Sequence, residues 1–449
     1  MKKPILFGIS LAIIVGAGLG VLIWWLVEER HPSFTTILLE ENALGTIPYN
    51  AAFTRIRGAG DIFWWFYPTT RSDPSSQPLI LWLDGVTGIP PSLLANFGMF
   101  GPYDLNMNER TNSWVDNYNL LFVDAPLGTG FSKAERDNQI PKSLEQNSNH
   151  LLNALESFYN RNSNYTTTPL YIFGEGHGAQ LALSLAIKLA EDAPFEHNLK
   201  RVVIGNGIID PTIALTKLGF YLEELAYVDN NGRNVLETFS NETRQLVADG
   251  QNGEAFDKFL SLGRVINEEA GAVAVNLAFI ADKLTRESTA VADDFGLRKY
   301  VQDASHSRSD ILKFMDETVA PALGISNDRV YDEGRVAVLE AFRNVFLLPA
   351  VHLIEYILQN TNYAVTIYNG NMDAVSNTPG QLEWIENLEW SGKDEFISSP
   401  RRTLIVNSRV EGYFRETPRL QFYWMNAAGL SVPFDSPVAM RRVLERILI

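Results

Sequence analysis

Residues 169–192 read "PLYIFGEGHGAQLALSLAIKLAED" and hold the pattern that decides the fold. The apolar run at the start has the length and composition of a buried strand, and residues 179–192 have the apolar spacing of a helix. Between them Gly174, Gly176 and Gly178 have the spacing of a nucleophile elbow, the sharp strand-to-helix turn that presents a catalytic side chain. A catalytic elbow carries Ser, Cys or Asp at its centre, whereas this chain has Gly176 there.

Five more apolar runs resemble this strand, and each ends in a loop that contains a glycine. They are "PLILWLDG" (78–85), "NLLFVDAPLGTG" (119–130), "RVVIGNG" (201–207), "AVTIYNGNMD" (364–373) and "RLQFYWMNAAG" (419–429). Runs that are apolar on both faces are typical of parallel strands buried inside a sheet. Together with the strand–turn–helix–strand order of residues 169–207, they predict an α/β protein with a doubly wound, mostly parallel sheet.

The middle of the chain has a different pattern. Residues 211–345 are dominated by helical segments such as "EAFDKFLSLGRVI" and "GRVAVLEAFRNVFLL". We therefore predict a helical cap lobe at 211–345. It is inserted into a core made of residues 31–210 and 346–449, where the strand pattern resumes near Tyr363.

The N-terminal residues 1–30 have the features of a membrane-targeting segment. Two lysines precede an uncharged run of 23 residues from Ile5 to Val27. At about 1.5 Å per residue, such a run spans the roughly 30 Å of hydrocarbon in a bilayer, and Trp24 and Trp25 lie where interfacial anchors belong. We predict an uncleaved signal anchor with the body in the lumen or outside the cell. The alternative is a cleaved signal peptide, which gives a secreted or lysosomal protein.

Composition excludes several classes of function. The formal net charge of −16 disfavours a nucleic-acid partner, which needs a basic surface. The chain has no cysteine and its six histidines lack metal-ligand spacing, so we predict no disulfide, no metal site and no cofactor. Glycosylation sequons begin at Asn164 and Asn241, which is compatible with a body in the secretory pathway.

The ends of the predicted strands are where ligands bind in doubly wound sheets. A hydrolase of this kind needs a nucleophile on the elbow, an acid on a later strand end, and then a histidine. Asp373 lies at the right place for the acid, but the chain has no histidine after His352.

These strand ends also resemble the motifs of the serine carboxypeptidase family, and within it the vitellogenic carboxypeptidase-like branch. The matching stretches, in order, are "PLILWLDGVTG", "NLLFVDAPLGTGFS", "YIFGEGHGAQ", "IGNGIIDP", "VTIYNGNMDAV" and "AAGLSVPFDSP". The resemblance extends over residues 35–449 and implies an α/β-hydrolase fold with a helical insertion.

The resemblance also implies which site residues are kept and which are replaced. The family's serine falls on Gly176 and its histidine on Leu430, while its aspartate is retained as Asp373. His177, one residue past the elbow apex, is predicted to be a packing residue that points away from the pocket. A glycine at the elbow apex relaxes a turn that commonly has positive φ, and Leu430 fills the volume of the missing imidazole.

The resemblance also implies that the residues that bind a peptide's C-terminal carboxylate in the family have changed. Glu175 is retained, either as a ligand group or as a buried structural carboxylate, but the family's asparagine has become Asp84. Two carboxylates repel a third near pH 7 and accept it only when protons are shared at acidic pH. The loop with one oxyanion-hole amide now reads Gly85-Val86, where the family has two glycines.

Three hypotheses follow. The first is a membrane-anchored, catalytically inactive carboxypeptidase homologue that binds a peptide or a partner protein. The second is a working serine-type carboxypeptidase that uses a different set of residues. The third is a structural or adhesion ectodomain whose old pocket is closed.

Overall fold

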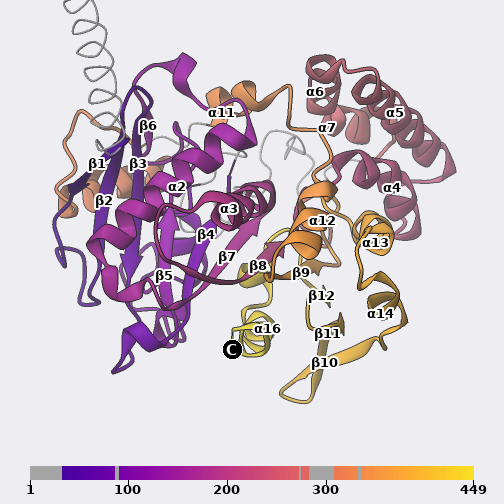
Figure 1. Ribbon diagram of the computed structural model, residues 1–449. Helices are drawn as coiled ribbons and strands as arrows, with labels where there is room; N and C mark the ends of the chain where they lie inside the picture. Colours follow the sequence, from indigo (N-terminus) through magenta and orange to yellow (C-terminus); the bar gives the residue numbers. More distant parts are fainter. Residues whose placement is uncertain (1–32, 86–89, 273–274, 283–307, 332–334, 449) are drawn as a thin grey trace, which may run out of the picture.

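The computed structural model describes residues 33–85, 90–272, 275–282, 308–331 and 335–448 (Figure 1). The predicted N-terminal segment 1–30 and Val86 lie outside these residues. Twelve strands form one sheet in the order β1-β2-β3-β5-β4-β7-β8-β9-β12-β11-β10, with β6 paired to β3. Their bounds are β1 Phe34–Leu38, β2 Asn50–Ile56, β3 Gly60–Tyr67, β4 Leu79–Leu83, β5 Asn119–Val123, β6 Lys133–Ala134, β7 Pro169–Glu175, β8 Asn198–Gly205, β9 Ala364–Gly370, β10 Arg402–Val406, β11 Arg409–Glu416 and β12 Leu420–Met425.

The centre of the sheet is parallel and its two margins are antiparallel. Strands β5, β4, β7, β8, β9 and β12 run in one direction. These are the six runs that the sequence predicts as buried parallel strands. The hairpins β1–β2–β3 and β10–β11 add the antiparallel margins. Because β3 pairs antiparallel with β5, and β11 with β12, the sheet is mixed rather than purely parallel.

Helices occupy the connections between the strands. The α-helices are α2 Leu144–Arg161, α3 Gly178–Asp192, α4 Pro211–Glu224, α5 Asn230–Ala248, α6 Asn252–Leu260, α7 Leu262–Arg264, α9 Arg308–Phe314, α10 Ala320–Ala322, α11 Arg335–Phe342, α12 Val351–Asn360, α13 Thr378–Asn387, α14 Lys393–Ser398, α15 Val432–Asp435 and α16 Pro437–Ile447. Three π-helical turns are η2 Leu94–Phe100, η6 Val265–Glu269 and η7 Met315–Val319.

Each face of the sheet is covered by its own hydrophobic core. One core joins the sheet to α2, α3, α12 and α13. The other joins the opposite face to η2, α16 and the helices α9, η7 and α10. Burial of apolar surface on this scale stabilises the sheet by roughly 25 cal/mol per Å². The cores therefore hold the fold together in a chain that has no disulfide.

Apart from α12, which packs in the core with α2, α3 and α13, the helices described between β8 and β9 fall into two groups. Helices α4–α7 and η6 form a third core with α11 and lie to one side of the sheet (Figure 1). Helices α9, η7 and α10 instead pack on the face of the sheet beside η2. Among the helices of the described residues, none has the length and hydrophobicity of a membrane span.

Candidate active site

The turn between β7 and α3 has the backbone of a nucleophile elbow. Gly176 has φ of +57°, the left-handed conformation expected at its apex. Its N–H donates to the carbonyl of Gly205 at 3.0 Å, and its carbonyl accepts from the N–H of Ile208 at 3.0 Å. A Cβ built on Gly176 meets no atom within 4 Å. The apex is therefore fixed in position and has open space where a side chain would stand.

The other two elbow glycines are required by close packing. A Cβ on Gly178 would lie 2.3 Å from the carbonyl oxygen of Leu83, and one on Gly174 would lie 2.3 Å from the carbonyl oxygen of Gly178. Helix α3 therefore approaches β7 and the end of β4 more closely than any side chain permits. The glycine spacing read from the sequence thus has a steric basis at two of its three positions.

Asp373 lies in the loop after β9 and is completely buried. The side-chain amide of Asn206 donates to its Oδ2 at 2.8 Å, and the N–H of Val375 donates to its Oδ1 at 2.8 Å. Burial raises the pKa of Asp373 to about 7, although the hydrogen bond from Asn206 opposes the shift. The carboxyl group is held firmly, and neither of these partners is a histidine.

The ring of His177 points into the helical lobe. It is fully buried and stacks on Phe346 with ring centroids 5.4 Å apart, while Phe342 approaches its edge at 5.9 Å. Neither ring nitrogen has a hydrogen-bond partner among the described residues. Burial lowers the pKa of His177 to about 3, so the imidazole is neutral at physiological pH. The His177 ring therefore contacts aromatic side chains of the helical lobe.

The segment after β12 brings a serine rather than a histidine to the site. Leu430 is half-buried, and its N–H donates to the carbonyl of Ala278 at 2.7 Å. The next residue, Ser431, is buried and donates its hydroxyl to Oε2 of Glu175 at 3.2 Å. The sequence left Glu175 either as a ligand group or as a buried structural carboxylate and did not reveal this partner.

Several buried carboxyl groups gather at this edge of the sheet. Glu175 at the end of β7 is buried, and its pKa is raised well above the usual range by burial and then by the negative charge of Asp84. Asp84 after β4 accepts from the indole N–H of Trp82 at 3.2 Å, and burial raises its pKa to about 7. Asp124 after β5 is also fully buried and has a pKa raised to about 6 by burial. Protons on these groups therefore remain bound at mildly acidic pH.

The loop after β4 contains a glycine that packs closely against the start of α3. Gly85 has φ of +96°, and a Cβ there would lie 2.9 Å from the backbone nitrogen of Gly178. Only glycine fits this approach of the loop to the start of α3.

A short segment of the helical lobe lies across the loops that carry Asp373 and Leu430. We call residues 275–282 the strap. The carbonyl of Leu277 accepts from Ala374 at 2.8 Å, and the N–H of Ile280 donates to Met372 at 2.8 Å. The Tyr227 hydroxyl also donates to the Ile280 carbonyl. The strap thus joins the loops that carry Asp373 and Leu430, a feature that the sequence did not reveal.

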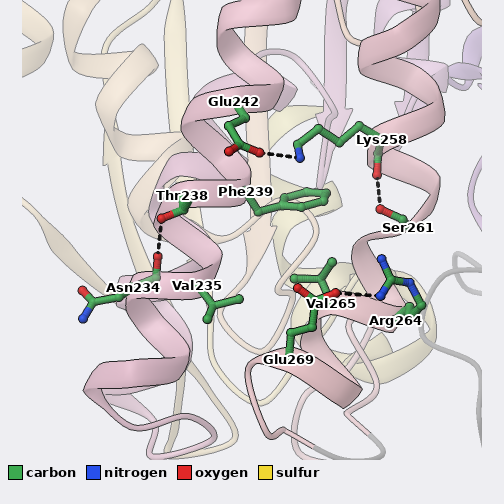
Figure 2. A pocket seen from close by; sticks show the side chains of 10 residues that line it. All are labelled: Asn234, Val235, Thr238, Phe239, Glu242, Lys258, Ser261, Arg264, Val265 and Glu269. Carbon is green, nitrogen blue, oxygen red and sulfur yellow. Dashed lines mark hydrogen bonds and ion pairs between the residues drawn. The ribbon is translucent and has the colours of Figure 1, made fainter.

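Two hollows among the described residues are lined largely by the helical lobe. A groove of about 490 Å³ lies between α5 and the α6–η6 segment (Figure 2). Its walls carry two ion pairs, Glu242–Lys258 at 2.7 Å and Arg264–Glu269 at 2.6 Å, with the Phe239 ring between them. A second, apolar cavity of only about 20 Å³ lies beside Ala374.

Two further predicted positions can be placed. Asn164 lies in a short 3₁₀ turn before β7, and Asn241 lies on α5; both are exposed. Within the described part of the chain, no group of three or more His, Cys, Asp or Glu side chains could hold a metal ion.

Comparison with known proteins identifies the family. The sequence model of the family "Serine carboxypeptidase" matches residues 51–449. The chain belongs to the serine carboxypeptidase family. It is 27% identical over 420 residues to serine carboxypeptidase-like 51 of Arabidopsis thaliana, covering 88% of this chain and 90% of that relative. It is 25% identical to vitellogenic carboxypeptidase of Aedes aegypti, covering 91% and 88%.

A solved structure supports the fold. The crystal structure of Kex1(delta)p, a prohormone-processing carboxypeptidase from Saccharomyces cerevisiae, superposes with a TM-score of 0.76 at 22% identity. The match covers 92% of this chain and 95% of that structure. The serine carboxypeptidase-like chain therefore has the α/β-hydrolase fold that its motifs predict.

Proposed function

We propose that this protein is a catalytically inactive member of the serine carboxypeptidase family that has kept the fold as a binding body. One observation carries the proposal: the apex of the elbow is Gly176, which offers no oxygen or sulfur to attack a peptide carbonyl. A covalent mechanism needs such a nucleophile and an adjacent base. Loss of a triad residue typically lowers the rate by thousands-fold or more.

Neighbouring side chains do not replace the missing groups. His177 packs between two phenylalanine rings of the helical lobe, and its pKa of about 3 makes it a poor base. The hydroxyl of Ser431 donates to Glu175, whose raised pKa favours the protonated form. A protonated carboxyl group is not a general base, so Ser431 has no group to activate it.

The carboxyl groups at the strand ends support recognition of an acidic ligand at low pH. At about pH 5 Asp84 holds its proton because burial raises its pKa to about 7, and burial also raises the pKa of Glu175 and so favours its neutral form. Neutral carboxyl groups can donate hydrogen bonds to the C-terminal carboxylate of a peptide. Above pH 7 ionised Asp84 repels that carboxylate. We propose peptide or protein C-termini as the ligand class.

We propose that the protein acts in the secretory pathway. The uncharged run from Ile5 to Val27 supports a signal anchor with the body on the lumenal or extracellular side. The exposed Asn164 and Asn241 are then available as glycosylation sites. A relative in Apis mellifera, 28% identical, is named a venom serine carboxypeptidase, which agrees with this route.

The strap favours a second candidate, a structural ectodomain with a closed pocket. Its carbonyl groups accept from Ala374 and Leu430, so it ties together the two loops between which a ligand would enter. A Cβ on Gly429 would lie 2.1 Å from the Ala278 carbonyl oxygen, which shows how closely the strap approaches.

Activity is tested with the full chain and two assays. A fluorophosphonate probe and a series of N-terminally blocked peptides with free C-termini are applied between pH 4 and pH 7. We expect no labelling and no released amino acid. The double variant Gly176→Ser with Leu430→His should recover only weak activity, because Asp84 remains. Labelling of the wild-type chain, or released amino acids, would contradict the inactive assignment.

Binding separates the two candidates. An N-terminally blocked hydrophobic dipeptide is titrated as the free acid and as the amide at pH 5 and pH 8. We expect the free acid to bind at least tenfold more tightly at pH 5, and the Asp84→Asn variant to lose this pH dependence. Absence of binding at both pH values, with the fold intact by circular dichroism, supports the closed ectodomain instead.

A further inference from the structure

We propose that the sheet edge on which β4, β5 and β7 end faces a phospholipid bilayer, with Val330 and Val336 as contact residues. This orientation rests on the signal anchor proposed above, and it specifies which side of the folded body faces the membrane. It follows from the point at which the chain enters the sheet, the length of the connection to the anchor, and the exposed apolar side chains nearby.

Strand register fixes the entry point. Phe34, the first residue of β1, pairs with Ile56 at the end of β2, which in turn pairs with Gly60 at the start of β3. Further along β3, Trp64 pairs with Val123, the last residue of β5. The start of β1 therefore lies on the edge of the sheet where β5 ends. Strands β4 and β7 end on this edge too, because they run parallel to β5.

The connection to the anchor is short compared with the body. Only residues 28–33 separate the uncharged run from Phe34. At 3.3–3.6 Å per residue, the seven steps from Val27 to Phe34 span at most about 25 Å. A folded body of about 400 residues is roughly 55 Å across by the usual scaling of the radius of gyration. A connection shorter than the body cannot reach around it, so the start of β1 must lie near the bilayer. Because β1 is the outermost strand of the sheet, this places one end of the edge on the bilayer side.

The surface beside the entry point carries exposed apolar side chains. Val330 is 58% exposed and Val336 is 83% exposed. Val330 follows Arg329 in the chain and therefore lies near β2 and β3. The Arg329 guanidinium forms an ion pair with Asp61 on β3 at 2.5 Å and lies over the Phe53 ring of β2 at 4.1 Å. Val336 is on α11.

The rest of α11 and the β2–β3 turn complete this surface. Val338 of α11 packs towards Gly128, which lies in the loop after β5; a Cβ on Gly128 would be 3.2 Å from it. The exposed Arg57 lies in the β2–β3 turn, and its N–H donates to the carbonyl of Ser33 at 3.0 Å. Apolar side chains flanked by an arginine suit the bilayer interface, where acyl chains meet phosphates.

This orientation narrows the ligand class of the proposed function. The elbow at the end of β7 lies on the same sheet edge as the entry point, two strands beyond β5. Ligands that reach it in the anchored protein are C-termini presented close to the membrane surface. A soluble peptide would have to enter between the body and the bilayer.

The test uses single-cysteine variants of the full chain in phosphatidylcholine vesicles, and the absence of native cysteine removes any background labelling. Val330→Cys and Val336→Cys carry an environment-sensitive fluorophore, and a doxyl-labelled lipid serves as the quencher. The matched control is Ile405→Cys on β10, an aliphatic side chain that is 56% exposed. The β10–β11 hairpin lies at the far end of the molecule from the start of β1 (Figure 1).

We expect at least twofold quenching at positions 330 and 336 and none at position 405. Equal quenching at all three positions, or none at any, overturns the orientation. Vesicle flotation is measured on the same samples. A chain that does not float overturns the anchor and the orientation together. A chain that floats without selective quenching overturns the orientation alone and leaves the binding assays of the proposed function unaffected.

Discussion

The backbone of the elbow and the side chains around it are under different steric constraints. At Gly174 and Gly178 the backbone elements approach so closely that no side chain fits. At Gly176 the backbone has φ of +57° and a Cβ would meet no atom within 4 Å, so packing does not decide which side chain stands there. Close packing therefore determines the shape of the turn, but it does not determine the side chain at its apex.

The largest expected effect concerns the buried carboxyl groups. Their pKa values are raised in the folded protein, so the folded state binds more protons than the unfolded state between about pH 4 and pH 7. Stability is then greatest at acidic pH and is lost as the pH rises through the folded pKa values. We expect the free energy of unfolding at pH 8 to be lower than at pH 5 by about 5 kcal/mol.

Urea denaturation across this pH range measures the effect. Asp84→Asn should weaken the dependence, because it removes one of the three ionising groups and leaves Asp124 and Asp373. The exposed Asp192→Asn serves as the control and should leave it unchanged. A stability that rises with pH would show that these carboxyl groups are ionised in the folded protein.

The next prediction tests whether close packing requires a glycine at position 178. Gly178→Ala forces a methyl group against the Leu83 carbonyl and should lower the free energy of unfolding by about 3 kcal/mol. Thermal unfolding by circular dichroism measures the loss. A loss below about 1 kcal/mol would show that α3 can move away from β4.

A smaller effect is expected at the retained acid. Asn206→Ala removes the donor to Asp373 and should cost about 2 kcal/mol, because a buried carboxyl group loses a partner. The same change should raise the pKa of Asp373 further, which shifts the pH dependence of unfolding. If stability is unchanged, the Asn206 contact is not needed to hold the acid loop.

The smallest effect is expected at the apex itself. Gly176→Ala has open space for its methyl group but must adopt φ of +57°, which costs about 1 kcal/mol. Gly250→Ala is the matched control, since Gly250 has φ of +75° and equally open surroundings. Similar losses in urea denaturation at both positions would show that backbone conformation alone sets the cost. A much larger loss at Gly176 would contradict this.

The central strands could be predicted from the sequence because each is apolar on both faces and ends in a glycine-containing loop. The antiparallel margins were missed. A signal existed for β2 and β3, since Gly58-Ala59-Gly60 forms a turn before the aromatic run of residues 62–67. That run is not followed by a glycine-containing loop, so it did not match the pattern from which the central strands were predicted.

At the site, the sequence identified candidate functional side chains, but it did not identify the residues that form hydrogen bonds with them. Asp373 and His177 were assigned by their place after a strand and after the elbow apex. Asn206 and Ser431, which bond Asp373 and Glu175, come from distant parts of the chain. Pairings of this kind depend on tertiary contacts, which no local pattern encodes. The strap was missed for the same reason, since most of its bonds to the loops are made by backbone groups.

The pairing of β8 with β9 has a consequence for biosynthesis. These neighbours in the sheet are separated by the whole of residues 206–363, so the ribosome completes β8 long before β9 exists. During that interval the nascent chain displays an unpaired apolar strand edge, the feature most prone to aggregate. Without cysteines, covalent cross-links cannot protect this half-built sheet. Its maturation should therefore depend on chaperones that shield strand edges rather than on disulfide isomerases.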